Sequence, residues 1–393
     1  MKEDSRANVS VILALTLVHF IGDFYNAFIN PLFPVFVREF SLTLAQIGLI
    51  AGIGRFLAFI VQPSVGYLAD RYPTRLFILL GPLLSIVFFP LVGAAPGFWA
   101  LMLFVCLGSV GSSMFHPTTA GMVSDYAGGH FGFSMSIYNM GGTLAFGLGP
   151  LFITHIVSSY GLSATPLTMI LGLAALPFLF RGLPCPRVEG LKEFGFIGSL
   201  REVLGGVWKS IVIIWVVMVL RAYVSQSFLI FMPVMFAEEG YSLVSIGKMV
   251  SLFTVAGTAS GLIAGHLSDR IGYKPLFYMS YGLTTPALYL LLYLPGNWVY
   301  LSVLVAGFVA MATLPLGVAM AQELAPKGRS MVSSIMMGLA FGTGGMITPL
   351  TGTLADIYGI RTVLAVLAII PFLTIGLIFL LPETRNKPYH PSL

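Results

Sequence analysis

Long apolar stretches dominate the chain, and short turns rich in Gly, Pro and charged residues separate them. A helix that crosses the hydrocarbon core of a bilayer needs about 20 apolar residues. The pattern therefore predicts an all-α polytopic membrane protein with twelve transmembrane helices. We expect these helices at about residues 9–37, 44–68, 76–95, 98–123, 131–157, 162–180, 209–236, 244–267, 276–294, 297–322, 330–355 and 360–381.

One longer polar stretch, at residues 181–208, divides these helices into six and six. We therefore predict an N-terminal six-helix bundle at 1–180 and a cytoplasmic central loop at 181–208. A C-terminal six-helix bundle with a short cytoplasmic tail is expected at 209–393.

The charged residues are few and unevenly placed. Hydrophobic residues make up 57% of the chain and charged residues only 9%, whereas soluble domains average about 25% charged residues. Fifteen of the twenty Lys and Arg residues fall in loops on the side of the two termini, and three fall on the other side. Cytoplasmic loops carry such an excess of positive charge. We therefore expect a multi-pass protein of the cytoplasmic (inner) membrane with both termini in the cytoplasm. The net charge of +5 comes from these loops, and we predict no nucleic-acid partner.

The two halves of the sequence repeat each other at an offset of about 199 residues. A six-residue segment, Gly-x-Leu-x-Asp-Arg, follows the second and the eighth predicted span, and an acidic residue follows the fourth and the tenth. Such charges next to helix ends can meet helix dipoles and opposite charges, so we interpret them as a conformational latch. The alternative is that they only enforce the membrane topology. The expected latch residues are Gly66, Asp70, Arg71, Asp125, Gly265, Asp269, Arg270 and Glu323.

A six-plus-six duplication with this loop in each half resembles the major facilitator superfamily, which has two six-helix bundles related by a pseudo-twofold axis. More specific motifs are similar to its fosmidomycin-resistance family of drug exporters. These motifs are His19-x-x-x-Asp23, Gly111-Ser-Ser-Met-Phe-His116-Pro117, Phe341-Gly-Thr-Gly-Gly345 and Leu381-Pro-Glu-Thr-Arg385. The resemblance covers nearly the whole chain and implies a proton-driven exporter of small antibiotics. Thr118 and Arg55 depart from the family pattern, so the family's substrate is not carried over.

Polar residues inside the apolar spans are costly in lipid and usually functional. In the first span, His19, Asp23, Asn26 and Asn30 follow one another at intervals of 4, 3 and 4 residues. This spacing places them on one face of a helix. Since lipid cannot satisfy such a face, it must point into the bundle or into a wet cavity.

A second polar face is expected in the fourth span, where Ser112 and Ser113 precede His116. Histidine titrates near neutral pH. We therefore expect proton coupling at His116 and His19 as well as at Asp23, which would be the main proton carrier. The alternative for the serines is interhelical hydrogen bonding, and the alternative for His116 is a fixed hydrogen bond.

Two arginines also lie inside predicted spans. Arg55 is expected at a depth similar to that of Asp23, so we predict a buried ion pair between them. Arg221 falls 198 residues after Asp23, at the equivalent position of the second half. Counted with neutral histidines, the spans carry one excess positive charge, which favours an anionic substrate. The alternative for both arginines is a structural pairing. The expected substrate-binding residues are Arg55, Arg221, Asn26, Asn30, Ser112 and Ser113, and we expect Arg221→Gln to weaken binding more than Arg55→Gln.

These features predict a proton-coupled secondary transporter that exports a small anionic or zwitterionic compound or antibiotic by alternating access. The alternative on the same fold is an uptake symporter or facilitator for an organic anion. An intramembrane enzyme or metal-binding protein and a non-transporting sensor are further alternatives. We expect no enzyme activity, no cofactor and no metal. The expected partners are a small-molecule substrate, protons and the lipid bilayer, and we expect a monomer.

Overall fold

The computed structural model is all-helical and describes residues 7–69, 75–128, 131–185, 205–325, 332 and 335–382. The helices of the N-terminal half are α1 (Val9–Asn26), α2 (Ile29–Phe40), α3 (Leu44–Ala69), α4 (Leu76–Leu91), α5 (Phe98–Tyr126), α6 (Phe131–Tyr160) and α7 (Met169–Gly182). Short 3-10 turns follow α4 and precede α7. Most of the predicted central loop lies outside the described residues.

The C-terminal half repeats this order with more interruptions. Its helices are α9 (Trp208–Glu238), α10 (Leu243–Ile271), α11 (Tyr273–Tyr293), α12 (Trp298–Met311), α13 (Leu314–Leu324), α15 (Ala340–Met346), α16 (Thr348–Tyr358), α17 (Ile360–Leu367) and α18 (Ile370–Phe379). A π-helical turn, η4 (Ile335–Leu339), precedes α15. With the broken helices joined, the described helices fall into twelve segments, and this confirms the predicted fold class.

Four of the predicted spans are broken helices rather than single ones. The first span changes from α1 to α2 at Ala27 and Phe28. The other three breaks are followed by a proline in the first turn of α13, α16 and α18. Proline has no backbone N–H and interrupts the hydrogen bonding of a continuous helix, but it suits the first turn of a new one. Nine helical segments in the described part of the chain are long and apolar enough to cross a membrane.

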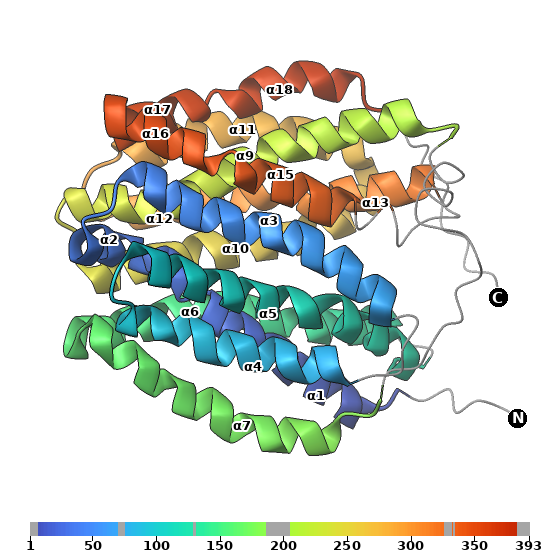
Figure 1. The fold of residues 1–393 in the computed structure, drawn as a ribbon. Helices are drawn as coiled ribbons and strands as arrows, with labels where there is room; N and C mark the ends of the chain where they lie inside the picture. The colour runs from blue at the N-terminus through green and yellow to red at the C-terminus, as the bar shows by residue number, and fades with distance from the viewer. Residues whose placement is uncertain are drawn as a thin grey trace, which may run out of the picture.

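The two halves form bundles that lie side by side, and the start of α1 and the end of α18 are at the same end (Figure 1). We call this end the terminal side and the opposite end the distal side. Large apolar side chains such as Trp99, Phe133, Leu167 and Phe379 are exposed on the outer surface of the bundles. This exposure is expected of side chains that face lipid rather than water.

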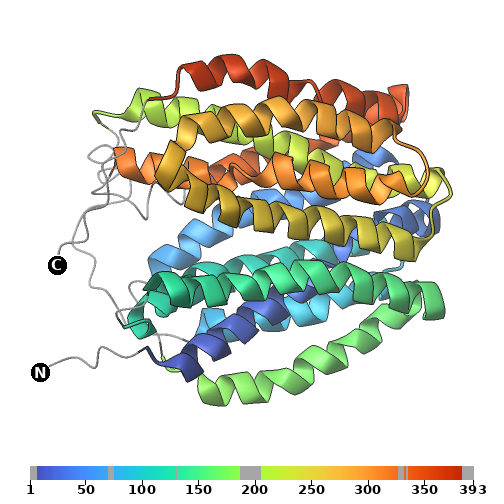
Figure 2. The ribbon, with the colours of Figure 1, turned by 180° about the vertical axis from the view of Figure 1, so that it is seen from behind.

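The two halves meet where α2 packs against α9 and along two further helix pairs: α3 packs against α15 and α16, and α6 packs against α10. Figure 2 shows the second pair from behind. At the distal end of the first pair, the two carboxylate oxygens of Asp356 accept hydrogen bonds from the backbone N–H groups of Leu44 and Ala45 at 2.8 and 2.9 Å. The hydroxyl of Thr348 donates to the carbonyl of Gly48 at 3.0 Å. Asp356 therefore caps the first turn of α3 from the other half.

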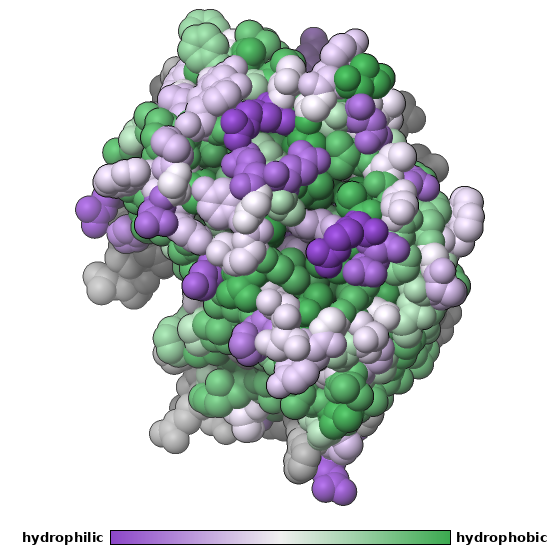
Figure 3. Space-filling model, turned by 90° about the vertical axis from the view of Figure 1, so that its left-hand side faces the viewer, coloured by the Kyte–Doolittle hydropathy of each residue, from purple (hydrophilic) through white to green (hydrophobic). Residues whose placement is uncertain are grey.

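In the second pair, Ser251 donates a hydrogen bond to the carbonyl of Gly147 at 2.6 Å. Gly247 lies against Pro150 and Thr154 so closely that a Cβ atom would collide with them. Contacts between the halves thus extend from the distal end to the middle of the helices. Figure 3 looks on to the distal end and shows side chains covering it, many of them hydrophilic. Toward the terminal side, the ribbons of α3 and α13 diverge (Figure 1).

Candidate functional site

A cavity of about 360 Å³ lies between the two halves. Its polar lining residues are Asp23, Asn26, Asn30, Arg55, Gln62, Ser109, Ser112, Ser113, His116 and Gln226. All of them except Gln226 belong to the N-terminal half. Aromatic side chains, including Phe33, Phe146 and Phe341, complete the wall. The cavity therefore has a polar wall from one bundle and a mainly apolar wall from the other.

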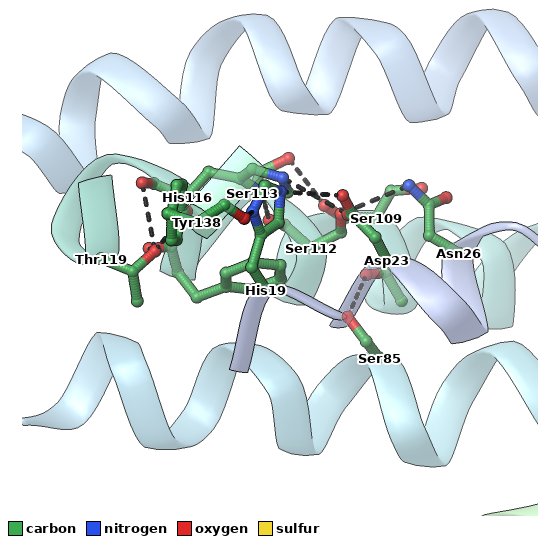
Figure 4. A network of polar contacts seen from close by, with 12 residues as sticks. His19, Asp23, Asn26, Ser85, Ser109, Ser112, Ser113, His116, Thr119 and Tyr138 are labelled. Carbon is green, nitrogen blue, oxygen red and sulfur yellow. Dashed lines mark hydrogen bonds and ion pairs between the residues drawn. The ribbon is translucent and has the colours of Figure 1, made fainter. Parts of the chain in front are cut away.

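Asp23 is the centre of the polar wall, and its side chain contacts two histidines (Figure 4). Its Oδ2 lies 3.1 Å from Nε2 of His19, and its Oδ1 lies 3.3 Å from Nε2 of His116. The residue itself is only 3% exposed. His19 precedes it by one helical turn on α1, whereas His116 comes from α5. We call these three residues the His–Asp–His cluster.

Backbone carbonyl groups orient both imidazoles. Nδ1 of His19 lies 2.9 Å from the carbonyl oxygen of Tyr138 on α6, and Nδ1 of His116 bonds to the carbonyl oxygen of Ser112. A carbonyl oxygen only accepts hydrogen bonds, so each Nδ1 carries a proton. The Nε2 atoms therefore point at Asp23. The ring of Tyr138 stacks on His19 with centroids 4.3 Å apart, which further limits rotation of that imidazole.

This arrangement has room for two exchangeable protons. Lone pairs on Nε2 and on a carboxylate oxygen repel each other unless a hydrogen lies between them. With both Nδ1 atoms already protonated, each contact of Asp23 can take up one further hydrogen. With both of these protons the cluster would have a net charge of +1, and without them it would have −1.

A glycine on α6 makes room for the cluster. A Cβ atom on Gly142 would lie 2.7 Å from Nε2 of His19 and 3.1 Å from Oδ2 of Asp23. Both distances are too short for a carbon atom against these side chains. Sequence reasoning missed Tyr138 and Gly142. The doubled glycine at 141–142 is the only signal in the chain that suggests close approach of a helix at this point.

Arg55 lines the cavity but does not form the predicted ion pair with Asp23. Among the described residues, no carboxylate oxygen lies within ion-pair distance of its guanidinium. Its aliphatic part packs against Gly345 of α15, which holds the side chain at the boundary of the two halves. The two imidazoles occupy both carboxylate oxygens of Asp23, so the arginine is left facing the cavity.

Arg221 occupies a different environment from the predicted one. It is 4% exposed and does not line the cavity. Its guanidinium lies over the ring of Phe341 at 5.0 Å, and Phe341 itself lines the cavity. None of its three nitrogens has a hydrogen-bond partner within the described part of the chain. The aromatic ring thus separates this cation from the cavity.

The smaller polar residues lie on the cavity wall as predicted. The amide of Asn26 donates to the hydroxyl of Ser112 at 3.4 Å and so links α1 to α5. The hydroxyl of Ser113 donates to the carbonyl of Ser109 in its own helix at 2.7 Å. Asn30 lies toward the distal side on α2. This polar surface offers hydrogen-bonding groups to a ligand in the cavity.

The expected latch lies partly outside the described residues. Asp70, Arg71 and the side chain of Asp269 belong to that part. Glu323 accepts a hydrogen bond from the hydroxyl of Tyr273 at 2.7 Å. The remaining members lie near the terminal side, with Gly66 on α3, Asp125 on α5, and Gly265 and Arg270 on α10. The latch stays a prediction.

Comparison with known proteins adds an independent line of evidence. A model of the Major Facilitator Superfamily matches residues 15–349 and 214–392. The fosmidomycin resistance protein of Escherichia coli (strain K12) is 28% identical, over 98% of this chain and 95% of that protein. An uncharacterised transporter of the same superfamily, YfnC of Bacillus subtilis (strain 168), is 26% identical over 96% of this chain and 93% of its own.

Among solved structures, the chain is similar to a bacterial homologue of the human lysosomal transporter Spinster in an inward-facing, occupied conformation. The TM-score is 0.80 and the sequence identity is 17%. The match covers 95% of this chain and 97% of that chain. At this identity the likeness concerns the fold.

Proposed function

The chain belongs to the major facilitator superfamily of secondary transporters, and we propose that it is a proton-coupled exporter of a small zwitterionic or anionic compound. The observation that carries this proposal is the contact of Asp23 with two histidines on the wall of the central cavity, which can take up two exchangeable protons. Charged groups at this depth in a membrane protein are costly and are kept where they act on ions or substrates.

An exporter that uses the proton gradient needs protons and substrate to exclude each other. The cluster meets this need for a substrate that carries a cationic group. Such a group can take the place of the two protons beside Asp23, because the cationic group and the protons neutralise the same carboxylate. An anionic group of the same substrate can bind Arg55, whose guanidinium faces the cavity and suits carboxylates and phosphates. A zwitterion therefore fits the wall better than a simple cation.

The two halves would move as rigid bundles about this cavity. Hydrogen bonds between α3 and α16 and between α6 and α10 close the distal side, while α3 and α13 diverge toward the terminal side (Figure 1). We assign the terminal side to the cytoplasm on the charge distribution of the loops. With this assignment, the hydrogen bonds join the halves at the end away from the cytoplasm, as expected of a conformation that accepts substrate from the cytoplasm of a bacterial inner membrane.

The relatives support export more than uptake. The name of the Escherichia coli relative refers to resistance against an antibiotic, fosmidomycin. An export protein with this cavity would lower the cytoplasmic concentration of a compound of similar size and charge. Fosmidomycin has an anionic phosphonate but no cationic group, so the first probes are fosmidomycin and a zwitterionic compound of similar size.

The test is transport by purified protein in liposomes under an imposed pH gradient. With the lumen acidic, an exporter inserted with its terminal side outward should accumulate the labelled zwitterion, because protons leave as substrate enters. Collapse of the gradient with a protonophore should stop the accumulation. Accumulation only when the lumen is alkaline would contradict export.

One observation favours a second candidate, an uptake symporter for an organic anion. The protonated cluster has a charge of +1 beside Arg55, and an anion without a cationic group binds best to that form. Proton and substrate would then travel together. A panel of small mono- and dianions in the same liposomes distinguishes the two, since their uptake would require an alkaline lumen.

A further inference from the structure

The His–Asp–His cluster has the composition of a metal site as well as of a proton site. It offers two imidazole nitrogens and one carboxylate oxygen, and these three donor atoms all lie within 4.8 Å of one another. We propose that His19, Asp23 and His116 bind a divalent transition-metal ion of the Zn²⁺ type. From the sequence, only His19 and Asp23 were expected to lie together, one turn apart on a single helix. No metal site was predicted.

The orientation of the histidines supports this proposal. Metal-binding histidines almost always donate their second ring N–H to a carbonyl or carboxylate group, which fixes the tautomer and directs the other nitrogen at the ion. Both histidines of the cluster have this arrangement, with the carbonyls of Tyr138 and Ser112 as acceptors. The helices α1, α5 and α6 therefore hold the donor atoms in place before an ion arrives.

The charge of the cluster also suits a divalent ion. Without an ion, the two Nε2 atoms and Asp23 can be bridged by two protons. A Zn²⁺ ion brings the same charge and can accept all three lone pairs at once. Exchange of two protons for one ion leaves the net charge of the buried cluster unchanged, so it avoids the cost of adding charge to a low-dielectric interior.

The cluster has an open side. Asp23 and His116 both line the central cavity, which provides a path for the ion and space for water. Three protein ligands with a free fourth position are typical of non-structural zinc sites. Imidazole and carboxylate donors suit Zn²⁺ and its neighbours among the transition metals rather than Mg²⁺ or Ca²⁺, which bind oxygen ligands.

The proposed metal site and the proposed transport function lead to different expectations. A bound ion would link α1 to α5 and occupy the atoms that we assign to protons, so it would inhibit proton-driven transport. Metal binding itself, however, depends only on the geometry of the three side chains. It can therefore be measured on protein that is not transporting, and failure of one proposal leaves the other to be judged separately.

The experiment is equilibrium dialysis of full-length, detergent-purified protein against Zn²⁺, after removal of any polyhistidine tag. We expect one ion per chain with micromolar or tighter affinity, and at least about tenfold weaker binding by His116→Gln. His155→Gln is the matched control, because His155 is exposed and belongs to another helix. Arg55→Gln should bind the ion more tightly than the unsubstituted chain, since a positive charge leaves the same cavity.

A second measurement does not depend on the folding of a variant. Co²⁺ bound to the unsubstituted chain should give visible d–d bands without a thiolate charge-transfer band, and Zn²⁺ should remove them. The proposal is wrong if the unsubstituted chain binds no ion at micromolar concentrations, or if His116→Gln and His155→Gln bind with equal affinity.

Discussion

Asp23 on α1 and Arg221 on α9 are 198 residues apart, close to the offset of the sequence repeat, yet their surroundings differ. Asp23 lies on the cavity wall, and each of its carboxylate oxygens faces an imidazole. Arg221 lies behind Phe341, and its three nitrogens lack hydrogen-bond partners among the described residues. The duplication kept the helices in register while the chemistry of the two positions diverged.

In the proposed function, this difference gives the two halves separate tasks. Carboxylate and imidazole groups can change their charge, whereas a guanidinium stays protonated at any accessible pH. The N-terminal half can therefore exchange protons, and the C-terminal half supplies a constant charge under an aromatic cover. A cation over an aromatic ring is stabilised by about 2 kcal/mol when it is desolvated, which offsets only part of the cost of its burial.

The largest effect should follow from removal of the variable charge. Asp23→Asn should reduce pH-gradient-driven transport in liposomes to the level of liposomes without protein, because the cluster loses its only carboxylate. Glu238→Gln is the control, since Glu238 is an exposed acid at the distal end of α9. Gradient-driven flux of Asp23→Asn equal to that of the control would eliminate Asp23 as the proton carrier.

A second change tests whether close helix packing holds the cluster together. Gly142→Ala should push Nε2 of His19 away from Asp23 and lower the free energy of unfolding by about 1–3 kcal/mol. Gly282→Ala on α11 is the matched control, because a Cβ atom there meets nothing within 4 Å. Thermal unfolding of both variants in detergent provides the measurement. Equal midpoints would show that the α1–α6 contact tolerates a methyl group.

The two arginines give the third test. Since Arg55 lines the cavity and Arg221 does not, Arg55→Gln should weaken substrate binding by about tenfold, or about 1.4 kcal/mol. Arg221→Met should leave binding within about twofold and should not lower thermal stability, because it removes an unpaired buried charge. This order is the reverse of the one expected from the sequence. Calorimetric titration of both variants decides it, and a larger loss for Arg221→Met would restore the earlier expectation.

The smallest effect concerns the aromatic cover. Phe341→Ala should expose Arg221 to the cavity and strengthen the binding of a dianionic substrate by a few fold. In that background Arg221→Met should remove the gain, whereas it has little effect with Phe341 present. Such non-additivity in a double-mutant cycle is the signature of direct coupling between neighbours. Additive effects would mean that Phe341 does not separate the guanidinium from the cavity.

The sequence was sufficient for the fold because lipid imposes a simple rule. A stretch of about 20 apolar residues must form a helix there, and the repeat of Gly66 at Gly265 revealed the duplication. The breaks at Pro315, Pro349 and Pro371 follow from local chemistry, although the spans were expected to be continuous. Helix bounds elsewhere agree with the prediction to within a few residues at most ends.

The site was harder to predict, because spacing along a helix reveals faces but not partners. The pattern identified Asp23 and His19 as one face and His116 as a residue of another. It could not show that both histidines meet Asp23, which leaves Arg55 without its expected partner. Nor could it show that an aromatic ring from a different helix would cover Arg221. These outcomes depend on the rotation of each helix about its axis, and tertiary packing determines that rotation.

The cap that Asp356 provides for α3 has a consequence for how the halves can separate. Its carboxylate satisfies two N–H groups of a helix from the other half, so these bonds exist only while the two helices are in contact at the distal end. Separation there would transfer both N–H groups to water. The equivalent helix of the other pair, α10, is capped by its own Ser242, and this cap does not depend on the other half. The two helix pairs are therefore held differently at their distal ends.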